Sequence, residues 1–172
     1  MKKVTLILVM ALMSLMSYAQ QDAVPVMKYG YLSYDSVFQA MPEYATMQAN
    51  LQALRDKYEA EQKRVEDDFN KKYEEFLDGQ ASFPTSILQK RQSELQDMLD
   101  KNIAFKKEGQ RLLKQAEGEA KAPLKKRLAN VLAQLGEERG YAFILNTDCN
   151  AVPWLNAAIA EDCTETVKAL LK

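Results

Sequence analysis

Apolar side chains recur every three or four residues along most of the chain between residues 43 and 139, and this spacing predicts long helices. The first stretch runs through Tyr44, Met47, Leu51, Leu54, Tyr58, Val65, Phe69, Tyr73 and Phe76, with a shift in the repeat at Glu61. The second runs through Leu88, Leu95, Met98, Phe105, Leu112, Ala116 and Ala120. Asn102 and Gly109 interrupt this second stripe, and we expect both to loosen the packing locally.

A turn near residues 79–85 separates the two stretches. Gly79 follows the last apolar position, Pro84 restricts Phe83 to an extended backbone, and Ser86 with Gln89 suggests a capping box. The arms at residues 43–78 and 86–122 are nearly equal, so they would lie antiparallel for about 50 Å at 1.5 Å per residue. Residues 43–122 therefore form a predicted helical hairpin.

Pro123 marks the end of this hairpin. A proline inside a helix removes a hydrogen bond and bends or breaks the rod. We therefore expect residues 124–138 to enter a separate base at a new angle. The apolar face that would dock there comprises Leu124, Leu128, Val131, Leu132 and Leu135.

Short extended segments near both ends of the chain should build this base. Residues 20–42 would supply a strand at Tyr29–Tyr34 and a short helix, and residues 123–172 would supply a second strand at Tyr141–Asn146. Ala151–Leu155 is a third extended candidate, and Asp162 with Glu165 should cap a closing helix. The predicted fold is mainly α, with a long antiparallel helical hairpin on a small sheet or barrel-forming body.

Residues 1–19 have the features of a cleavable signal peptide. Lys2 and Lys3 precede an apolar run from Val4 to Met16, and Ser17-Tyr18-Ala19 provides a small-x-small cleavage site. Cleavage leaves 21 of the 23 basic residues against 24 acidic ones, a net charge of −3. We expect an exported protein without a nucleic-acid partner, and this charge does not support contact with a membrane surface.

The two cysteines, Cys149 and Cys163, lie in the terminal base segment of this exported chain. A bridge between them would close a loop of about 15 residues and stabilise the fold by up to about 3 kcal/mol. We predict a disulfide, the alternative being two buried free thiols.

Nothing in the sequence indicates catalysis. The chain has no histidine and no glycine-rich phosphate loop, and its carboxylates are scattered along the predicted helices. The cysteine spacing matches neither a redox motif nor a zinc motif. We predict a non-enzymatic protein without a cofactor or a metal ion.

Three stretches of this sequence resemble the Skp/OmpH periplasmic chaperones in the form found in Bacteroidetes-type bacteria. They are YGYLSYDSVFQAMPEY at residues 29–44, APLKKRLANVLAQLGEERGYAFILN at residues 122–146, and the tail around Ala151-Val152 and Asp162–Val167. The resemblance implies a homotrimer whose strands form a small body and whose hairpins hang from it as tentacles. It also implies ATP-independent holding of unfolded outer-membrane β-barrel proteins in the periplasm.

The resemblance also suggests roles for particular residues. The candidate residues for the trimer body are Tyr29, Tyr31, Leu32, Tyr141, Phe143 and Leu145. The candidates for client binding lie near the hairpin tip, where the aromatic residues exceed what a two-helix seam needs: Phe69, Tyr73, Phe76, Phe83, Met98 and Phe105. Packing within the seam is the alternative role for each of them, and Phe83 in the turn is the best candidate for exposure.

A different function stays open, because a coiled-coil trimer of the cell envelope could also serve as an adaptor for one folded partner. A rigid, uninterrupted seam would favour that adaptor. The chain also departs from the best-known family members, which are strongly basic. We therefore expect apolar contacts rather than charge to dominate client binding.

Overall fold

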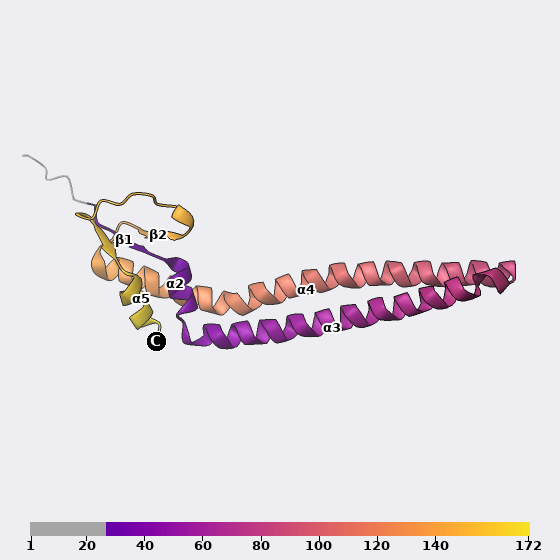
Figure 1. Cartoon of the computed structure of the whole chain (residues 1–172). Helices are drawn as coiled ribbons and strands as arrows, with labels where there is room; N and C mark the ends of the chain where they lie inside the picture. Colours follow the sequence, from indigo (N-terminus) through magenta and orange to yellow (C-terminus); the bar gives the residue numbers. More distant parts are fainter. Residues whose placement is uncertain (1–26) are drawn as a thin grey trace, which may run out of the picture.

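The computed structural model describes residues 27–172, so the signal peptide expected at residues 1–19 lies outside the described residues. Two long helices, α3 (Pro42–Gly79) and α4 (Thr85–Arg139), form a hairpin that projects from a small body (Figure 1). The body holds a three-stranded sheet and the short helices α2 (Tyr34–Gln39) and α5 (Thr164–Leu170). The predicted class, mainly helical with a small sheet, is confirmed.

The sheet joins the two ends of the chain. Strand β1 (Tyr29–Leu32) lies in the middle and pairs in parallel with β2 (Ile144–Asn146) on one side and β3 (Ala160–Asp162) on the other. β1 is shorter than the strand predicted to reach Tyr34, because Ser33 caps α2 by accepting a hydrogen bond from the Ser36 amide at 3.1 Å. Gly140, with a φ of 65°, ends α4 in the left-handed backbone conformation that glycine adopts readily.

The position of the third strand was predicted wrongly. Ala151–Leu155 forms no strand, and β3 begins only at Ala160. The chain turns away from the sheet just after β2, where Cys149 and Asn150 both adopt a left-handed backbone with a φ of 55°. The Asp148 carboxylate holds this turn by accepting a hydrogen bond from the Asp35 amide at 2.7 Å. Pro153 also lacks the amide hydrogen that a ladder requires.

The predicted helix caps differ from those observed. The Ser86–Gln89 capping box does not form, because Pro84 occupies the N-cap of α4 and no side chain caps that end. The hairpin turn instead contains a short 3-10 helix, η1 (Gln80–Ser82). At α5 the Asp162 carboxylate does accept a hydrogen bond, from the Thr164 amide at 2.9 Å, whereas Glu165 pairs with Lys168.

The hydrophobic core lies in the body and at the base of the hairpin. Val37 of α2, Leu128 of α4 and Val167 of α5 have no exposed surface. The other buried members are Leu32, Phe38, Met41, Met47, Leu51, Leu124, Leu135, Cys163 and Leu171. Leu124, Leu128 and Leu135 confirm the predicted docking face, and Val131 and Leu132 pack partly buried against the same core.

Helix α4 stays continuous through Pro123. It therefore carries the arm of the hairpin directly into the body, and it changes direction gently as it does so (Figure 1). Arg127 fastens this part of α4 to its surroundings, because its guanidinium pairs with Glu43 of α3 and donates to the Leu171 carbonyl at 2.9 Å. The segment predicted to enter the body at a new angle is thus a continuation of the second arm.

The disulfide prediction is wrong, because both cysteines are free. The Cys163 side chain is buried against β1, where its Sγ lies 3.2 Å from the Tyr31 carbonyl oxygen and a Cβ built on Gly30 would lie only 2.8 Å from it. Cys149 is exposed on the left-handed turn that follows β2. Cys163 thus fills the core beside β1, whereas Cys149 projects to solvent.

We predict that one thiol per chain reacts with a maleimide in the native protein and that two react after denaturation without reductant. Cys149 is exposed, whereas burial shields Cys163 and raises the pKa of its thiol, which lowers its thiolate population at neutral pH. Mass spectrometry of the labelled chain would count the thiols. Cys149→Ser should abolish native labelling, and labelling of neither thiol after denaturation would contradict the observed free state.

Candidate functional site on the helical hairpin

The hairpin is packed most tightly next to the body. Met47 and Leu51 of α3 are buried there, and Ala116 and Ala120 of α4 pack partly buried against the same cluster. The small alanine side chains allow the two helices to approach, and Arg55 pairs with Glu117 across the arms at 3.4 Å. This end of the hairpin belongs to the core of the body.

The middle of the hairpin is held by the two residues that were expected to loosen it. Gly109 is buried beneath Tyr58, and a Cβ placed on this glycine would lie 3.1 Å from the Tyr58 ring, which also packs against Phe105 with ring centroids 6.3 Å apart. The Asn102 side chain donates a hydrogen bond to the Val65 carbonyl at 3.0 Å. The expectation of loose packing was therefore wrong at both positions.

The outer part of the hairpin, at residues 66–101, is held differently. No side chain in this segment is buried. Every hydrogen bond and ion pair formed by its side chains stays within one arm or the turn, such as Lys72–Glu75 at 3.0 Å in α3 and Arg91–Glu94 at 3.0 Å in α4. Asn102 thus makes the outermost polar contact between the arms among residues 27–172. Partly exposed apolar contacts alone join the arms beyond it.

The turn at the tip is closed by Phe83. Its ring lies so close over Gly79 that a Cβ on this glycine would come within 2.3 Å of the ring. Phe83 was the best candidate for exposure, and the structure shows it half-buried. Gly79 is therefore needed for close approach of the ring rather than for an unusual backbone angle, because its φ is −94°.

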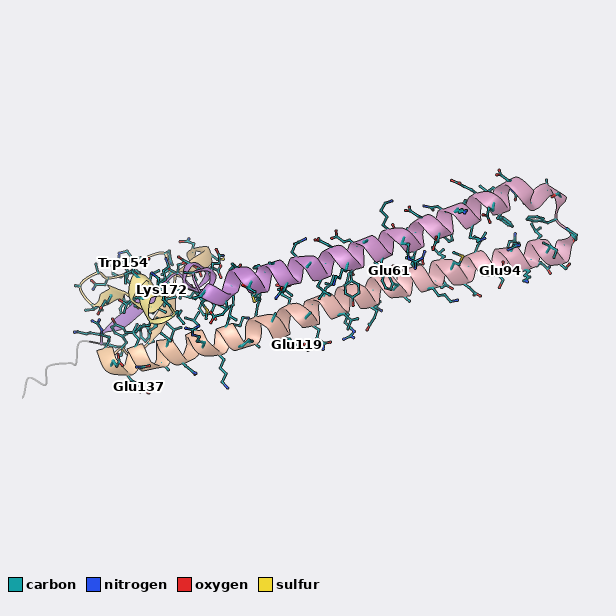
Figure 2. All side chains as sticks on the ribbon, turned by 90° about the horizontal axis from the view of Figure 1, so that it is seen from below. Glu61, Glu94, Glu119, Glu137, Trp154 and Lys172 are labelled. Atoms are coloured by element: carbon teal, nitrogen blue, oxygen red, sulfur yellow. The ribbon has the colours of Figure 1, made fainter. Side chains whose placement is uncertain are left out.

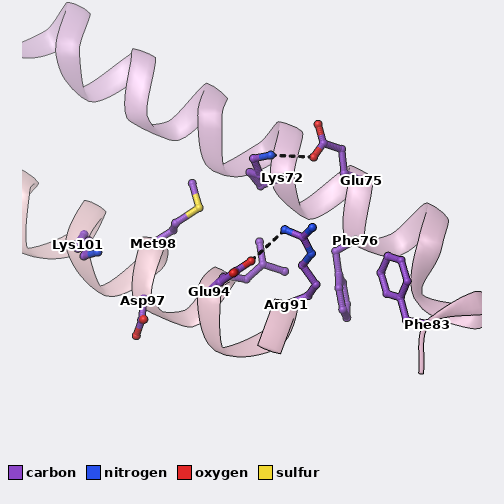
Figure 3. A pocket seen from close by; sticks show the side chains of 10 residues that line it. Lys72, Glu75, Phe76, Phe83, Arg91, Glu94, Asp97, Met98 and Lys101 are labelled. Atoms are coloured by element: carbon purple, nitrogen blue, oxygen red, sulfur yellow. Dashed lines mark hydrogen bonds and ion pairs between the residues drawn. The ribbon is translucent and has the colours of Figure 1, made fainter. Parts of the chain in front are cut away.

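An open cavity of about 430 Å³ lies between the arms just inside this turn (Figure 3). Its apolar part is formed by Phe76, Phe83, Leu95 and Met98, and three basic and three acidic side chains surround them. Three of the predicted client-binding residues, Phe76, Phe83 and Met98, are thus brought together. Leu95, which was assigned only to the seam, completes the set.

The other three candidates lie elsewhere. Phe69 lines a second cavity of about 360 Å³ together with Leu99 and Ile103, and Tyr73 stacks on Phe69 with ring centroids 6.1 Å apart. Phe105 belongs to the Tyr58 contact. Four exposed apolar residues outside the predicted helical stripes were not among the candidates, namely Leu77, Ile87, Leu99 and Ile103. These residues could have been found in the sequence, because an apolar residue that lies outside the seam of a two-helix hairpin is expected to face solvent.

Charged side chains such as Glu61, Glu94 and Glu119 are spread along the whole hairpin (Figure 2). Most of the ion pairs join residues three or four apart on one helix, as at Glu61, Arg64 and Asp68. A hydrogen bond from Lys72 lowers the pKa of Glu75, and one from Arg64 lowers the pKa of Glu61. Both carboxylates are therefore ionised at neutral pH, and the hairpin presents a charge-balanced outer surface.

The six candidates for the trimer body lie in and around the sheet. Leu32 is buried in the core, and Tyr141 packs against Gly30, where an added Cβ would meet the tyrosine ring at 3.1 Å. Tyr29 stacks on Phe143 with centroids 5.3 Å apart, and Phe143 remains 45% exposed. Tyr31 and Leu145 are partly buried. Met27 and Trp154 are also exposed, so the body carries apolar surface that one chain does not cover.

Comparison with protein families shows to which family this chain belongs. The family model "Outer membrane protein (OmpH-like)" matches residues 28–171. The chain belongs to the OmpH-like family. The fold of this OmpH-like chain also matches the crystal structure of a candidate outer membrane chaperone (OmpH-like) from Caulobacter crescentus, with a TM-score of 0.65 and 17% identity over 84% of this chain and 83% of the other. No curated protein matches the chain.

Two further features were sought in residues 27–172 of this OmpH-like chain, a metal site and a membrane-spanning helix. Histidine, cysteine and acidic side chains form no cluster there that could hold a metal ion. No helix in the same range combines the length and the apolar character needed to cross a membrane.

We predict that Asn102→Ala opens the middle of the hairpin. The substitution removes the outermost polar contact between the arms, so stability should fall by about 1 kcal/mol, as for an ordinary hydrogen bond. Amide hydrogen exchange should accelerate from residue 66 outward but not around Leu51. Asn70→Ala is the matched control, because Asn70 is exposed on the other arm. Equal effects of the two variants would contradict the assigned role.

Proposed function

We propose that this protein is an ATP-independent periplasmic holdase that binds unfolded outer-membrane β-barrel proteins between its hairpins. The observation that carries the proposal is the absence of any buried side chain in residues 66–101, which leaves apolar residues accessible along the outer hairpin. Membership of the OmpH-like family and the fold shared with the Caulobacter protein support the same role.

Holding an unfolded barrel protein requires many weak contacts rather than a chemical step. Strands of such clients alternate apolar and polar side chains, and exposed segments of this kind aggregate by pairing with one another. Tyr73, Ile87 and Ile103 offer apolar contacts at successive points along the hairpin, each more than 40% exposed. Methionine and aromatic side chains adapt to different partners, which suits a site that must accept many sequences.

The exposed apolar surface of the body supports a homotrimer as the working form. A single hairpin can contact a client from one side only, whereas three hairpins on one body would surround it. Met27, Phe143 and Trp154 are all exposed in the single chain, and a second copy would cover such residues. The candidate trimer residues Tyr29 and Phe143 form one stacked pair at this surface.

We predict that the mature protein, without nucleotide, keeps a urea-diluted outer-membrane barrel protein soluble at about one trimer per client. Light scattering after dilution measures this directly. Affinity should change less than about threefold between roughly 50 and 500 mM NaCl, because apolar contacts are not screened by salt. A steep loss of affinity with salt would contradict apolar binding. Failure to hold the client, together with tight binding to a folded envelope protein, would instead favour the adaptor function.

We predict a trimer by native mass spectrometry, and Phe143→Asp should dissociate it. A carboxylate at this apolar position should raise the concentration at which the trimer dissociates at least about tenfold. Leu77→Asp is the matched control, because Leu77 is 44% exposed at the hairpin tip and Phe143 is 45% exposed in the body. A wild-type monomer, or equal dissociation of the two variants, would refute the assignment.

A further inference from the structure

The cavity inside the hairpin turn has apolar lining beyond the one residue that packs over the turn. Phe83 already closes the tip by packing over Gly79. The remaining apolar residues, Phe76 of α3 with Leu95 and Met98 of α4, leave about 430 Å³ open between the arms. A volume in this range is typical of pockets that hold a small organic group, for which a few hundred Å³ is usual.

The arms around this cavity can separate at little cost. Polar contacts between the arms end at Asn102, and the ion pairs at the cavity, Lys72–Glu75 and Arg91–Glu94, each lie on one helix. Separation would therefore leave no side chain of either pair without its partner. It would sacrifice only apolar contacts that solvent already reaches, because no side chain of residues 66–101 is buried.

The chemistry of the residues that line the cavity indicates which kind of side chain can bind in it. Two phenylalanine rings, a leucine and a methionine sulfur favour an aromatic side chain, since aromatic rings and thioethers pack well against one another. The six surrounding charges balance: they are Lys72, Arg91, Lys101, Glu75, Glu94 and Asp97. Such a rim can pair with polar neighbours of either sign on both sides of the inserted ring. An extended strand that alternates apolar and polar residues has this pattern.

We propose that the tip cavity, between the two arms of a single hairpin, binds an aromatic side chain of an extended client strand. Figure 3 shows Phe76, Phe83 and Met98 directed into the space between the arms, with the Arg91–Glu94 pair beside them. This site is separate from any enclosure formed between the hairpins of different subunits. The inference rests on the proposed holdase function, since it names the feature of the client that one hairpin recognises.

The test uses the full mature protein and two synthetic strand peptides of about ten residues, the length of a barrel strand. Both peptides alternate apolar and polar residues, and they differ only in a central phenylalanine or alanine. The protein variants are Phe76→Gln and Met98→Gln, which remove apolar lining from opposite arms. Leu77→Gln is the matched control, because it removes an exposed apolar side chain one position from Phe76 that does not line the cavity.

Wild type should bind the phenylalanine peptide about tenfold more tightly than the alanine peptide, measured by fluorescence anisotropy. The preference should fall below about twofold in Phe76→Gln and Met98→Gln and should persist in Leu77→Gln. This comparison is a double-mutant cycle, so a general loss of hairpin stability would weaken both peptides alike and leave the preference unchanged. Circular dichroism confirms that each variant keeps its helices.

No preference in wild type, or the same preference in all variants, would overturn the tip site. The holdase assay with a whole barrel protein separates this result from the broader function. If wild type keeps the barrel protein soluble without a preference for the phenylalanine peptide, the holdase function stands and the tip site falls. If Phe76→Gln and Met98→Gln lose the preference but the barrel protein aggregates in the presence of wild type, the tip site stands and the holdase function falls.

Discussion

The structure depends on one small core in which α2, α4 and α5 bury Val37, Leu128 and Val167 against one another. Two helices that lie side by side can bury only a narrow stripe of each, so the long hairpin cannot provide such a core by itself. The second arm solves this problem by continuing into the body. Arg127 then joins this helix to Glu43 at the start of the first arm and to the carbonyl of Leu171. Both arms are thereby fixed at one end.

Packing consequently weakens in steps from the body to the tip. Buried Met47 and Leu51 secure the base, Tyr58 over Gly109 and Asn102 on Val65 secure the middle, and the segment beyond is joined only by half-exposed contacts. The base of each arm is therefore fixed by burial, whereas the outer segment is joined by fewer contacts that exclude solvent. The same two helices therefore provide both the buried support of the body and the solvent-exposed apolar surface of the outer hairpin.

The hairpin and the approximate positions of β1 and β2 could be predicted from sequence, because helical spacing and aromatic-rich short segments are local signals. The roles of Asn102 and Gly109 could not, because each depends on which residue of the other arm lies opposite. β3 was missed for a related reason, since Ala160–Asp162 is polar and owes its strand to the neighbouring Tyr31 backbone. The expected export and the cysteine spacing suggested a disulfide, but both cysteines are free, because the Cys163 side chain packs against β1 while Cys149 is exposed. The tip cavity could not be predicted either, because its volume depends on the distance between the arms.

The pairing of β1 with strands from the end of the chain also determines the order of folding. Tyr31 aligns with Leu145 and Asp162, so the sheet cannot form until almost the whole chain has been made. The hairpin closes around a local turn, and contacts of short sequence separation form faster than distant ones. We therefore expect each new copy to complete its arms while its body segments, including Val37 and Val167, are still exposed. Until its last helix docks, every copy is itself an unfolded chain at risk of aggregation.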